Sequence, residues 1–163
     1  KEVLRLTNKF TKLNSRFGII EYPVTLNEME KISLEFPKTE RKFYEFAIKA
    51  LKKVMKEEEK IYSFTTADPK LTKTGFIVIA ENNLIFVMMK GGLLGGAETE
   101  VIKYKDIKNV DFDIAPNPMG LAQMELGILI LEIKGMIGKK KRTIRNIPQN
   151  QLDRIVKLIR DKI

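Results

Sequence analysis

The chain has 163 residues, of which 44% are apolar and 31% are charged, and it contains no histidine, cysteine or tryptophan. Without histidine and cysteine, the sequence excludes thiolate nucleophiles, disulfides, zinc fingers and Ser-His-Asp triads. Lysine and arginine number 30 against 21 acidic residues, a formal charge of +9. A chain of this length buries a core of its own, and its apolar runs are far shorter than the ~20 residues that span a bilayer.

The first sixty residues carry helical patterns. Apolar residues at steps of three and four predict a helix ending at Gly18. Thr25 and Glu28 have the spacing of a capping box, which predicts a second helix that Pro37 interrupts. A third helix is expected over residues 38–59, with an apolar stripe of Phe43, Phe46, Ala47, Ala50, Leu51 and Val54. The sequence leaves open whether this stripe packs on the rest of the chain or on a second copy.

Seven short antiparallel strands are predicted from residue 61 onward, because apolar residues there alternate or form continuous runs between turn residues. The expected strands are 61–66, 75–80, 84–89, 98–104, 108–114, 125–133 and 139–146. Alternation predicts that Val110, Phe112 and Ile114 share a buried face. After Pro148, helical spacing predicts an amphipathic C-terminal helix.

The expected fold class is therefore α+β. We expect a seven-stranded antiparallel barrel or sandwich over residues 61–163, capped by the C-terminal helix, because such a helix closes an open end and protects the sheet edges. Residues 1–60 are expected to form a helical extension in front of it. The chain begins at Lys1, and a native segment before this residue is compatible with the sequence.

Three segments of the strand-rich half carry a more specific pattern. They are GFIVIAENNLIFV from Gly75, the glycine-rich loop GGLLGG at 91–96, and TEVIKYKDIKNV from Thr99. Together they resemble the bacterial pleckstrin-homology-like (PH-like) family of the YokE-like type, over about residues 61–163. The resemblance implies sheets of four and three strands plus the C-terminal helix, and a family without established catalytic residues.

The densest basic cluster comprises Lys139, Lys140, Lys141, Arg142 and Arg145. On an exposed strand, these side chains can attract the phosphates of anionic lipid or nucleic acid. No tyrosine or phenylalanine stands beside them for bases to stack on, which disfavours single-stranded nucleic acid. The alternative is an edge strand on which lysines discourage pairing with other chains.

Two loops supply further candidates. Lys70 and Lys73 are expected in the loop between the first two strands, where eukaryotic PH domains that bind phosphoinositides place basic residues; a solvated loop is the alternative. Leu93 and Leu94 lie at the tip of the glycine-rich loop. Two adjacent leucines there either insert into a partner or membrane interface or pack back on the sheet.

The sequence predicts a non-enzymatic binding or assembly module, with a protein partner or self-association as the first interpretation. Alternatives are a peripheral binder of anionic phospholipid surfaces and, because of the basic charge, a non-specific nucleic-acid binder. We expect no catalytic residue, metal, cofactor or small-molecule substrate, since Asp111 and Asp113 lack a third carboxylate and no acid–base pair stands out. The expected location is cytoplasmic, with peripheral membrane contact as an alternative.

Overall fold

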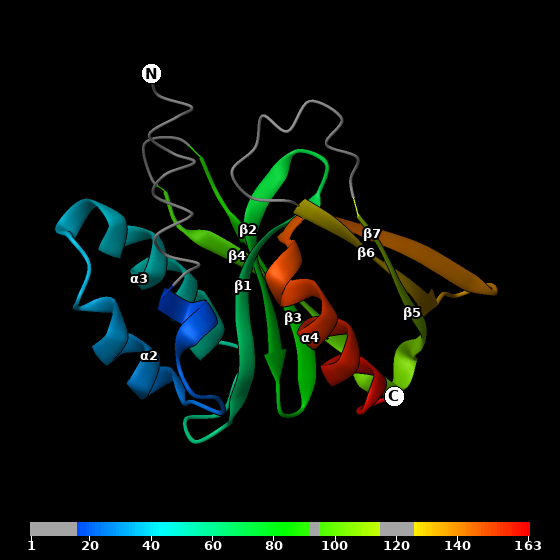
Figure 1. Cartoon of the computed structure of the whole chain (residues 1–163), viewed down its shortest axis with the longest axis horizontal. Coiled ribbons are helices and arrows are strands. Elements are labelled where there is room, and N and C mark those ends of the chain that lie inside the picture. Colours follow the sequence, from blue (N-terminus) through cyan, green and yellow to red (C-terminus); the bar gives the residue numbers. More distant parts are fainter. Residues whose placement is uncertain (1–15, 92–94, 115–125) are drawn as a thin grey trace.

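The structure, a computed structural model, describes residues 16–91, 95–114 and 126–163. Its helices are α2 (Leu26–Ser33), α3 (Lys38–Lys52) and α4 (Gln149–Arg160), with a 3-10 turn at Tyr104–Asp106. The strands are β1 (Ile61–Lys70), β2 (Lys73–Ala80), β3 (Asn83–Met89), β4 (Ala97–Lys103), β5 (Ile107–Ile114), β6 (Leu126–Lys134) and β7 (Lys139–Pro148). Figure 1 shows β1 to β3 with α2 and α3 on one side and with α4, β5, β6 and β7 on the other.

The strands follow the order β4-β3-β2-β1-β7-β6-β5, and every neighbouring pair is antiparallel. Strands β1–β4 form one sheet and β5–β7 another, joined where Asp68 of β1 pairs with Arg145 of β7. The predicted α+β fold with antiparallel sheets of four and three strands is confirmed. The edge-strand interpretation holds only for the lysine-bearing half of β7, because β1 pairs with β7 at Arg145 and ends at Lys70.

An apolar core lies between the two sheets. It contains Ile77, Ile79, Leu84 and Phe86 from the first sheet, Leu129, Leu131, Ile144 and Ile147 from the second, and Leu152, Ile155, Val156 and Ile159 from α4. Pro148 ends β7 and precedes α4, where its missing N–H needs no partner. Gly127 lets α4 approach, since a Cβ there would lie 2.4 Å from Leu152 Cδ2. The C-terminal helix is therefore part of the core.

The other face of β1–β4 is covered by α2 and α3. This second core contains Leu26, Met29, Tyr44, Ala47, Ile48 and Leu51 from the helices and Phe64, Phe76, Val78, Ile85 and Val87 from the strands. The helices thus pack on the sheet of their own chain, the alternative that the sequence left open. Because both faces of β2 and β3 are buried, these strands are continuous apolar runs instead of alternating ones.

The buried face of α3 differs from the predicted stripe. Tyr44 and Ile48 are buried, whereas Phe43 and Phe46 are only half-buried. The Tyr44 ring belongs to an aromatic cluster, and its centroid lies 4.9 Å from that of the Phe17 ring. This packing turns the buried face of α3 toward Tyr44. The helix also ends at Lys52 instead of residue 59, and the chain that follows still contributes Met55 to this second core before the charged run at 56–60.

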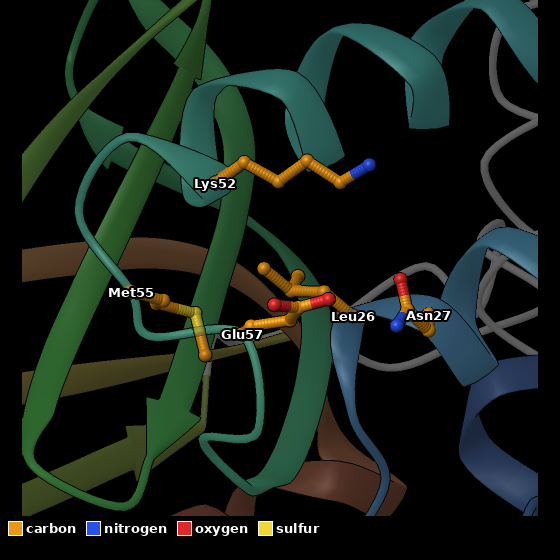
Figure 2. A pocket seen from close by; sticks show the side chains of 5 residues that line it. All are labelled: Leu26, Asn27, Lys52, Met55 and Glu57. Carbon is orange, nitrogen blue, oxygen red and sulfur yellow. The ribbon is translucent and has the colours of Figure 1, made fainter.

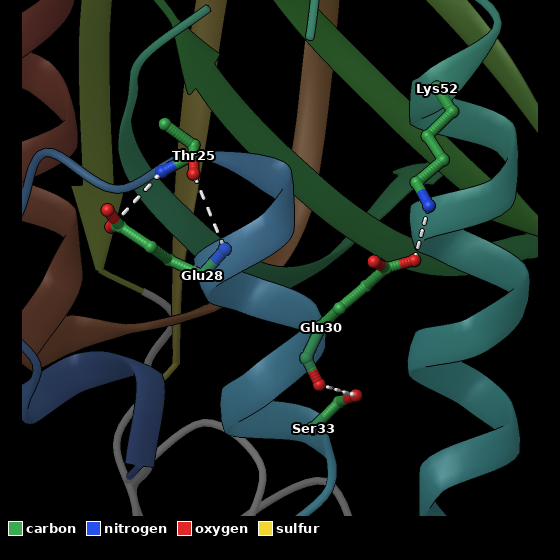
Figure 3. A network of polar contacts seen from close by, with 5 residues as sticks. All are labelled: Thr25, Glu28, Glu30, Ser33 and Lys52. Carbon is green, nitrogen blue, oxygen red and sulfur yellow. Dashed lines mark hydrogen bonds and ion pairs between the residues drawn. The ribbon is translucent and has the colours of Figure 1, made fainter. Parts of the chain in front are cut away.

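The start of α2 agrees with the prediction. The Glu28 N–H donates to Thr25 Oγ1 and the Thr25 N–H donates to the Glu28 carboxylate, both at 3.3 Å, which completes the capping box (Figure 3). Ser33 Oγ donates to the Glu30 carbonyl at 2.6 Å, and the Glu30 carboxylate pairs with Lys52 of α3. These contacts fix α2 against α3.

Two further predictions hold only in part. Residues 16–19 form a helical turn that passes the predicted end at Gly18 by one residue, and the earlier part of that helix lies outside the described residues. On β5, Val110 is buried but Phe112 and Ile114 are partly exposed, because only the first half of this strand joins the core between the sheets. No helix in the described ranges is long and apolar enough to cross a membrane.

Candidate binding surface

The hairpin of β6 and β7 carries the lysines of the predicted basic cluster. Its strands stay paired up to Lys134 opposite Lys139. The turn that follows, residues 135–138, is closed by the Gly135 N–H, which donates to the Gly138 carbonyl at 2.9 Å. Gly138 has a φ of +73°, a left-handed conformation that glycine adopts without strain. We call residues 132–141 the hairpin end; it projects at the far right of Figure 1.

Three lysines occupy the rungs directly behind the turn. The pairs are Lys139–Lys134, Lys140–Ile133 and Lys141–Glu132. Alternation places Lys139 and Lys141 on one face and Lys140 on the other. Lys139 Nζ lies 3.6 Å from Glu132 Oε2 with both side chains exposed, and such pairs contribute little. Within the described residues, Lys140 and Lys141 form no ion pair.

Arg142 stands apart from the three lysines that precede it. Its side chain is only 16% exposed and pairs with Glu100 of β4. The same guanidinium donates to the Pro69 carbonyl at 3.3 Å and lies 5.3 Å from the centre of the Phe86 ring. It therefore joins β7 to three strands of the other sheet, and this predicted binding residue is engaged within the chain.

Arg145 lies at an irregularity of β7. The register between β6 and β7 shifts between Ile144 and Ile147, so that Arg145 and Asn146 together oppose one residue of β6. Asn146 has a φ of +57° and donates to the Asp68 carboxylate at 2.5 Å. The bulge turns both isoleucines into the core and leaves Arg145 exposed, beside β1 and away from the hairpin end.

Lys70 and Lys73 were expected in a loop, and this prediction is wrong. Lys70 is the last residue of β1 and Lys73 is the first residue of β2. They face each other across a two-residue turn at residues 71–72. Asp68 and Pro69, which lie between the predicted strands 61–66 and 75–80, form a bulge in β1. Lys73 Nζ lies 3.9 Å from the Glu98 carboxylate, so part of the charge here is balanced.

The glycine-rich loop gives no test of its two leucines, because Leu93 and Leu94 lie outside the described residues. Its flanks form a closed base in which the Lys90 N–H donates to the Gly96 carbonyl at 2.9 Å. Gly95, with a φ of +56°, lies against the ring of Phe46 on α3. This end of the β3–β4 hairpin therefore contacts the helical side of the molecule.

Sequence reasoning missed the two residues at the tip of the β6–β7 hairpin. Met136 and Ile137 are fully exposed, at 106% and 97% of their reference areas. The two glycines of the segment Gly135–Met–Ile–Gly138, between the predicted strands 125–133 and 139–146, predict only a turn, because glycine permits turn dihedrals. The available signal was the presence of two large apolar residues where turns usually carry polar ones.

A small cleft lies between the start of α2, the end of α3 and the segment that follows α3 (Figure 2). It has a volume of about 270 Å³ and is lined by Leu26, Asn27, Lys52, Met55 and Glu57. Its two charged side chains have opposite signs, and Lys52 is already paired with Glu30. The cleft therefore offers neither a concentrated charge nor a mainly apolar wall, and we assign it no ligand.

The titratable groups with the largest shifts are tyrosines of the packed interior. Burial raises the pKa of Tyr22 to about 12 and raises the pKa of Tyr44 and Tyr104 as well. The Tyr104 hydroxyl donates to the Asn83 carbonyl at 3.0 Å. Because these pKa values are raised further above neutral pH, the three phenols stay protonated there. We therefore assign them a role in packing and hydrogen bonding.

Asp111 and Asp113 lie on the exposed face of β5. One carboxylate oxygen of each accepts the N–H of the following residue at 2.8 Å. Over the ranges that the structure describes, no three acidic side chains gather in a way that could hold a metal ion. These two aspartates therefore belong to the solvated face of an edge strand.

Two antiparallel sheets joined at one corner and capped by a C-terminal helix define the PH-like fold. Residues 55–161 match the model of the bacterial PH domain, and the chain belongs to this family, as the sequence predicted. It is 62% identical over 155 residues to the SPbeta prophage-derived uncharacterized protein YokE of Bacillus subtilis (strain 168), covering 94% of this chain and 97% of that protein.

The fold is also similar to a solved eukaryotic structure. The hSac2 domain from human phosphoinositide phosphatase Sac2 aligns with a TM-score of 0.50 and 9% identity, covering 78% of this chain and 84% of that one. At this identity, the similarity describes the arrangement of the strands and helices alone.

Proposed function

We propose that the chain is a non-enzymatic binding module whose hairpin end, residues 132–141, binds an anionic surface. The observation that carries this proposal is the concentration of charge on a projecting element: the hairpin end holds four lysines and one glutamate, a net charge of +3. Elsewhere, the candidate Lys73 lies beside Glu98, and Lys52 of α3 lies beside Glu30. The hairpin end is therefore the best anion-binding surface among the described residues.

The expected strength of this contact follows from the number of unbalanced lysines. A lysine close to an anionic surface contributes about 1 kcal/mol, so Lys134, Lys140 and Lys141 together contribute about 3 kcal/mol. That corresponds to binding no tighter than the millimolar range. Because the Debye length is only about 10 Å at 0.1 M salt, the contact weakens as salt is added.

Binding to immobilised inorganic polyphosphate, measured at low and at high salt, tests the proposal. The charge variant K139Q/K140Q/K141Q is compared with the control K42Q/K49Q/K53Q, which removes the same charge from exposed positions of α3 and its C-terminal end. We expect salt-sensitive retention that the hairpin variant loses and the control keeps. Equal retention of the two variants would contradict the proposal.

The protein-partner interpretation stays a prediction. One argument for self-association was an apolar helix face that could contact a second copy. In the structure, the apolar faces of α2 and α3 contact the sheet of the same chain instead. Nucleic acid is disfavoured because residues 132–141 include no aromatic side chain on which a base could stack. Neither alternative has an observation that favours it over an anionic surface.

A further inference from the structure

We infer that the anionic surface is a lipid bilayer and that the hairpin tip inserts into it, placing Met136 and Ile137 between the headgroups and the acyl chains. This inference rests on the proposed function, because the lysines that bind the surface also bring the tip to it. It adds a second, apolar contact and commits the hairpin end to one kind of partner.

The exposure of the tip is the first observation. Met136 and Ile137 are adjacent, fully exposed and framed by two glycines at the outermost point of the hairpin. Single exposed apolar residues are ordinary on protein surfaces, and Leu71 and Leu34 are examples here. Two neighbouring, fully exposed apolar side chains form a contact surface that a partner can cover.

The spacing between tip and lysines is the second observation. Residues along a strand are about 3.4 Å apart, so the rungs of Lys139, Lys140 and Lys141 lie within about 7 Å of each other, directly behind the turn. Interfacial segments sink about 5–10 Å into the boundary between headgroups and acyl chains. With the tip at that depth, the lysines lie at the level of the phosphates, and their flexible stems let each ammonium reach one.

The hairpin is also firm enough to insert without rearrangement. Leu131 and Ile133 of β6 pack into the core between the sheets, and Arg142 holds β7 to the opposite sheet. The two strands stay paired up to Lys134 and Lys139, and the Gly135 N–H closes the turn by donating to the Gly138 carbonyl. The hydrogen bond between Gly135 and Gly138 satisfies one backbone donor and one acceptor of the turn, which lowers the cost of moving the tip out of water.

The combination of features selects a bilayer over other anionic partners. Polyphosphate or nucleic acid would contact the lysines alone and leave Met136 and Ile137 in water. A bilayer presents both an anionic layer and an apolar layer behind it, in the order in which the hairpin presents lysines and tip. An acidic protein or a nucleic acid as the true partner is an outcome of the experiments below.

The first experiment measures co-sedimentation with vesicles of phosphatidylglycerol and phosphatidylcholine in equal parts. The tip variant M136S/I137S keeps every charge, and L34S is its control, since Leu34 is 63% exposed and follows α2 on the opposite side of the molecule (Figure 1). We expect the tip variant to bind about a hundredfold more weakly, because each of the two buried aliphatic side chains is worth about a factor of ten. The control should bind like the unaltered chain.

The second experiment uses the absence of tryptophan from the chain. An Ile137→Trp variant places a single indole at the tip, and Leu34→Trp places one at the control position. On the same vesicles, we expect the emission of the tip indole to shift to the blue and to be quenched by brominated lipid. The control indole should do neither, and polyphosphate should shift neither variant. Circular dichroism verifies that all variants fold.

The outcomes separate the inference from the proposal beneath it. Retention on polyphosphate together with an unquenched tip indole, or with full vesicle binding by M136S/I137S, overturns insertion and leaves anion binding in place. Failure of the unaltered chain on both polyphosphate and vesicles overturns both. Binding to duplex DNA or to polyglutamate without binding to vesicles overturns the bilayer as partner.

Discussion

Replacement of Arg142 tests whether this residue holds the two sheets together or binds a partner. An Arg142→Met substitution keeps an apolar stem beside Phe86 but removes the pairing with Glu100 and the hydrogen bond to the Pro69 carbonyl. Hydrogen bonds to charged groups contribute about 1.5–3 kcal/mol, and a partly exposed cation–π contact adds about 0.5–1 kcal/mol. Glu100 is 30% exposed and regains some water in the variant.

The expected loss is therefore about 2–3 kcal/mol of unfolding free energy. For a chain of this size, each kcal/mol lowers Tm by about 2–4 °C, so thermal unfolding followed by circular dichroism should shift by roughly 4–12 °C. Lys141→Met is the matched control, because Lys141 is the exposed neighbour on the same strand. Its unfolding free energy should change by less than about 0.5 kcal/mol.

A double-mutant cycle with Glu100→Gln isolates the pair itself. Because Arg142 and Glu100 contact each other, their substitutions should not be additive, and the coupling should be at least about 0.5 kcal/mol. If R142M shifts Tm no more than K141M does, Arg142 does not join the sheets. The residue would then return to the group of candidate binding residues in which the sequence placed it.

Three other perturbations test the packing around this site. Gly75→Ala places a Cβ 1.8 Å from the Val87 carbonyl oxygen, so β2 and β3 must separate, and urea unfolding should show a loss of about 3 kcal/mol or more. Thr25→Ala removes the helix cap and should cost about 1 kcal/mol in the same assay. Raising the pH from 10 toward 12 should lower stability, because unfolded tyrosines ionise near 10 while burial holds the pKa of Tyr22 at about 12 and also raises that of Tyr104; phenolate absorbance that rises well before unfolding would contradict this.

Local sequence signals predicted most of the fold because each depends on a few neighbouring residues. The capping box at Thr25 and the apolar spacing after Pro148 each place a helix within one residue of its observed start. The strand predictions erred where long-range pairing outweighs turn composition. Asp68 and Pro69 favour a turn in isolation, but pairing with β7 extends β1 through them as a bulge.

The candidate site was predicted less completely, because exposure depends on what the rest of the chain covers. Five consecutive positions show the limit: Lys139 to Lys141 are exposed, Arg142 is drawn inward by Glu100, and Thr143 is intermediate. Alternation alone cannot separate these cases, since Lys140 and Arg142 share a face. Composition marks Met136 and Ile137 as unusual turn residues but does not show that they are exposed, because apolar turn residues often fold back on a sheet.

The length of β1 explains why one half of β7 has a strand neighbour on both sides and the other half has a free edge. β1 pairs with β7 at Arg145 and ends at Lys70, so the lysine-bearing half of β7 has only β6 as a neighbour among the described strands. A free strand edge invites pairing with other chains, and lysines discourage it. Edge protection could therefore account for the lysines without any partner.

Edge protection does not account for the tip. A hairpin that only had to avoid other chains would carry polar residues in its turn, because an exposed Met136 and Ile137 promote the association that the lysines oppose. The two features agree only if the apolar tip has an occupant that tolerates, or requires, lysines around it. The strongest discrimination between a protected edge and a membrane contact therefore comes from these two uncharged side chains, whose replacement leaves the net charge of the hairpin end unchanged.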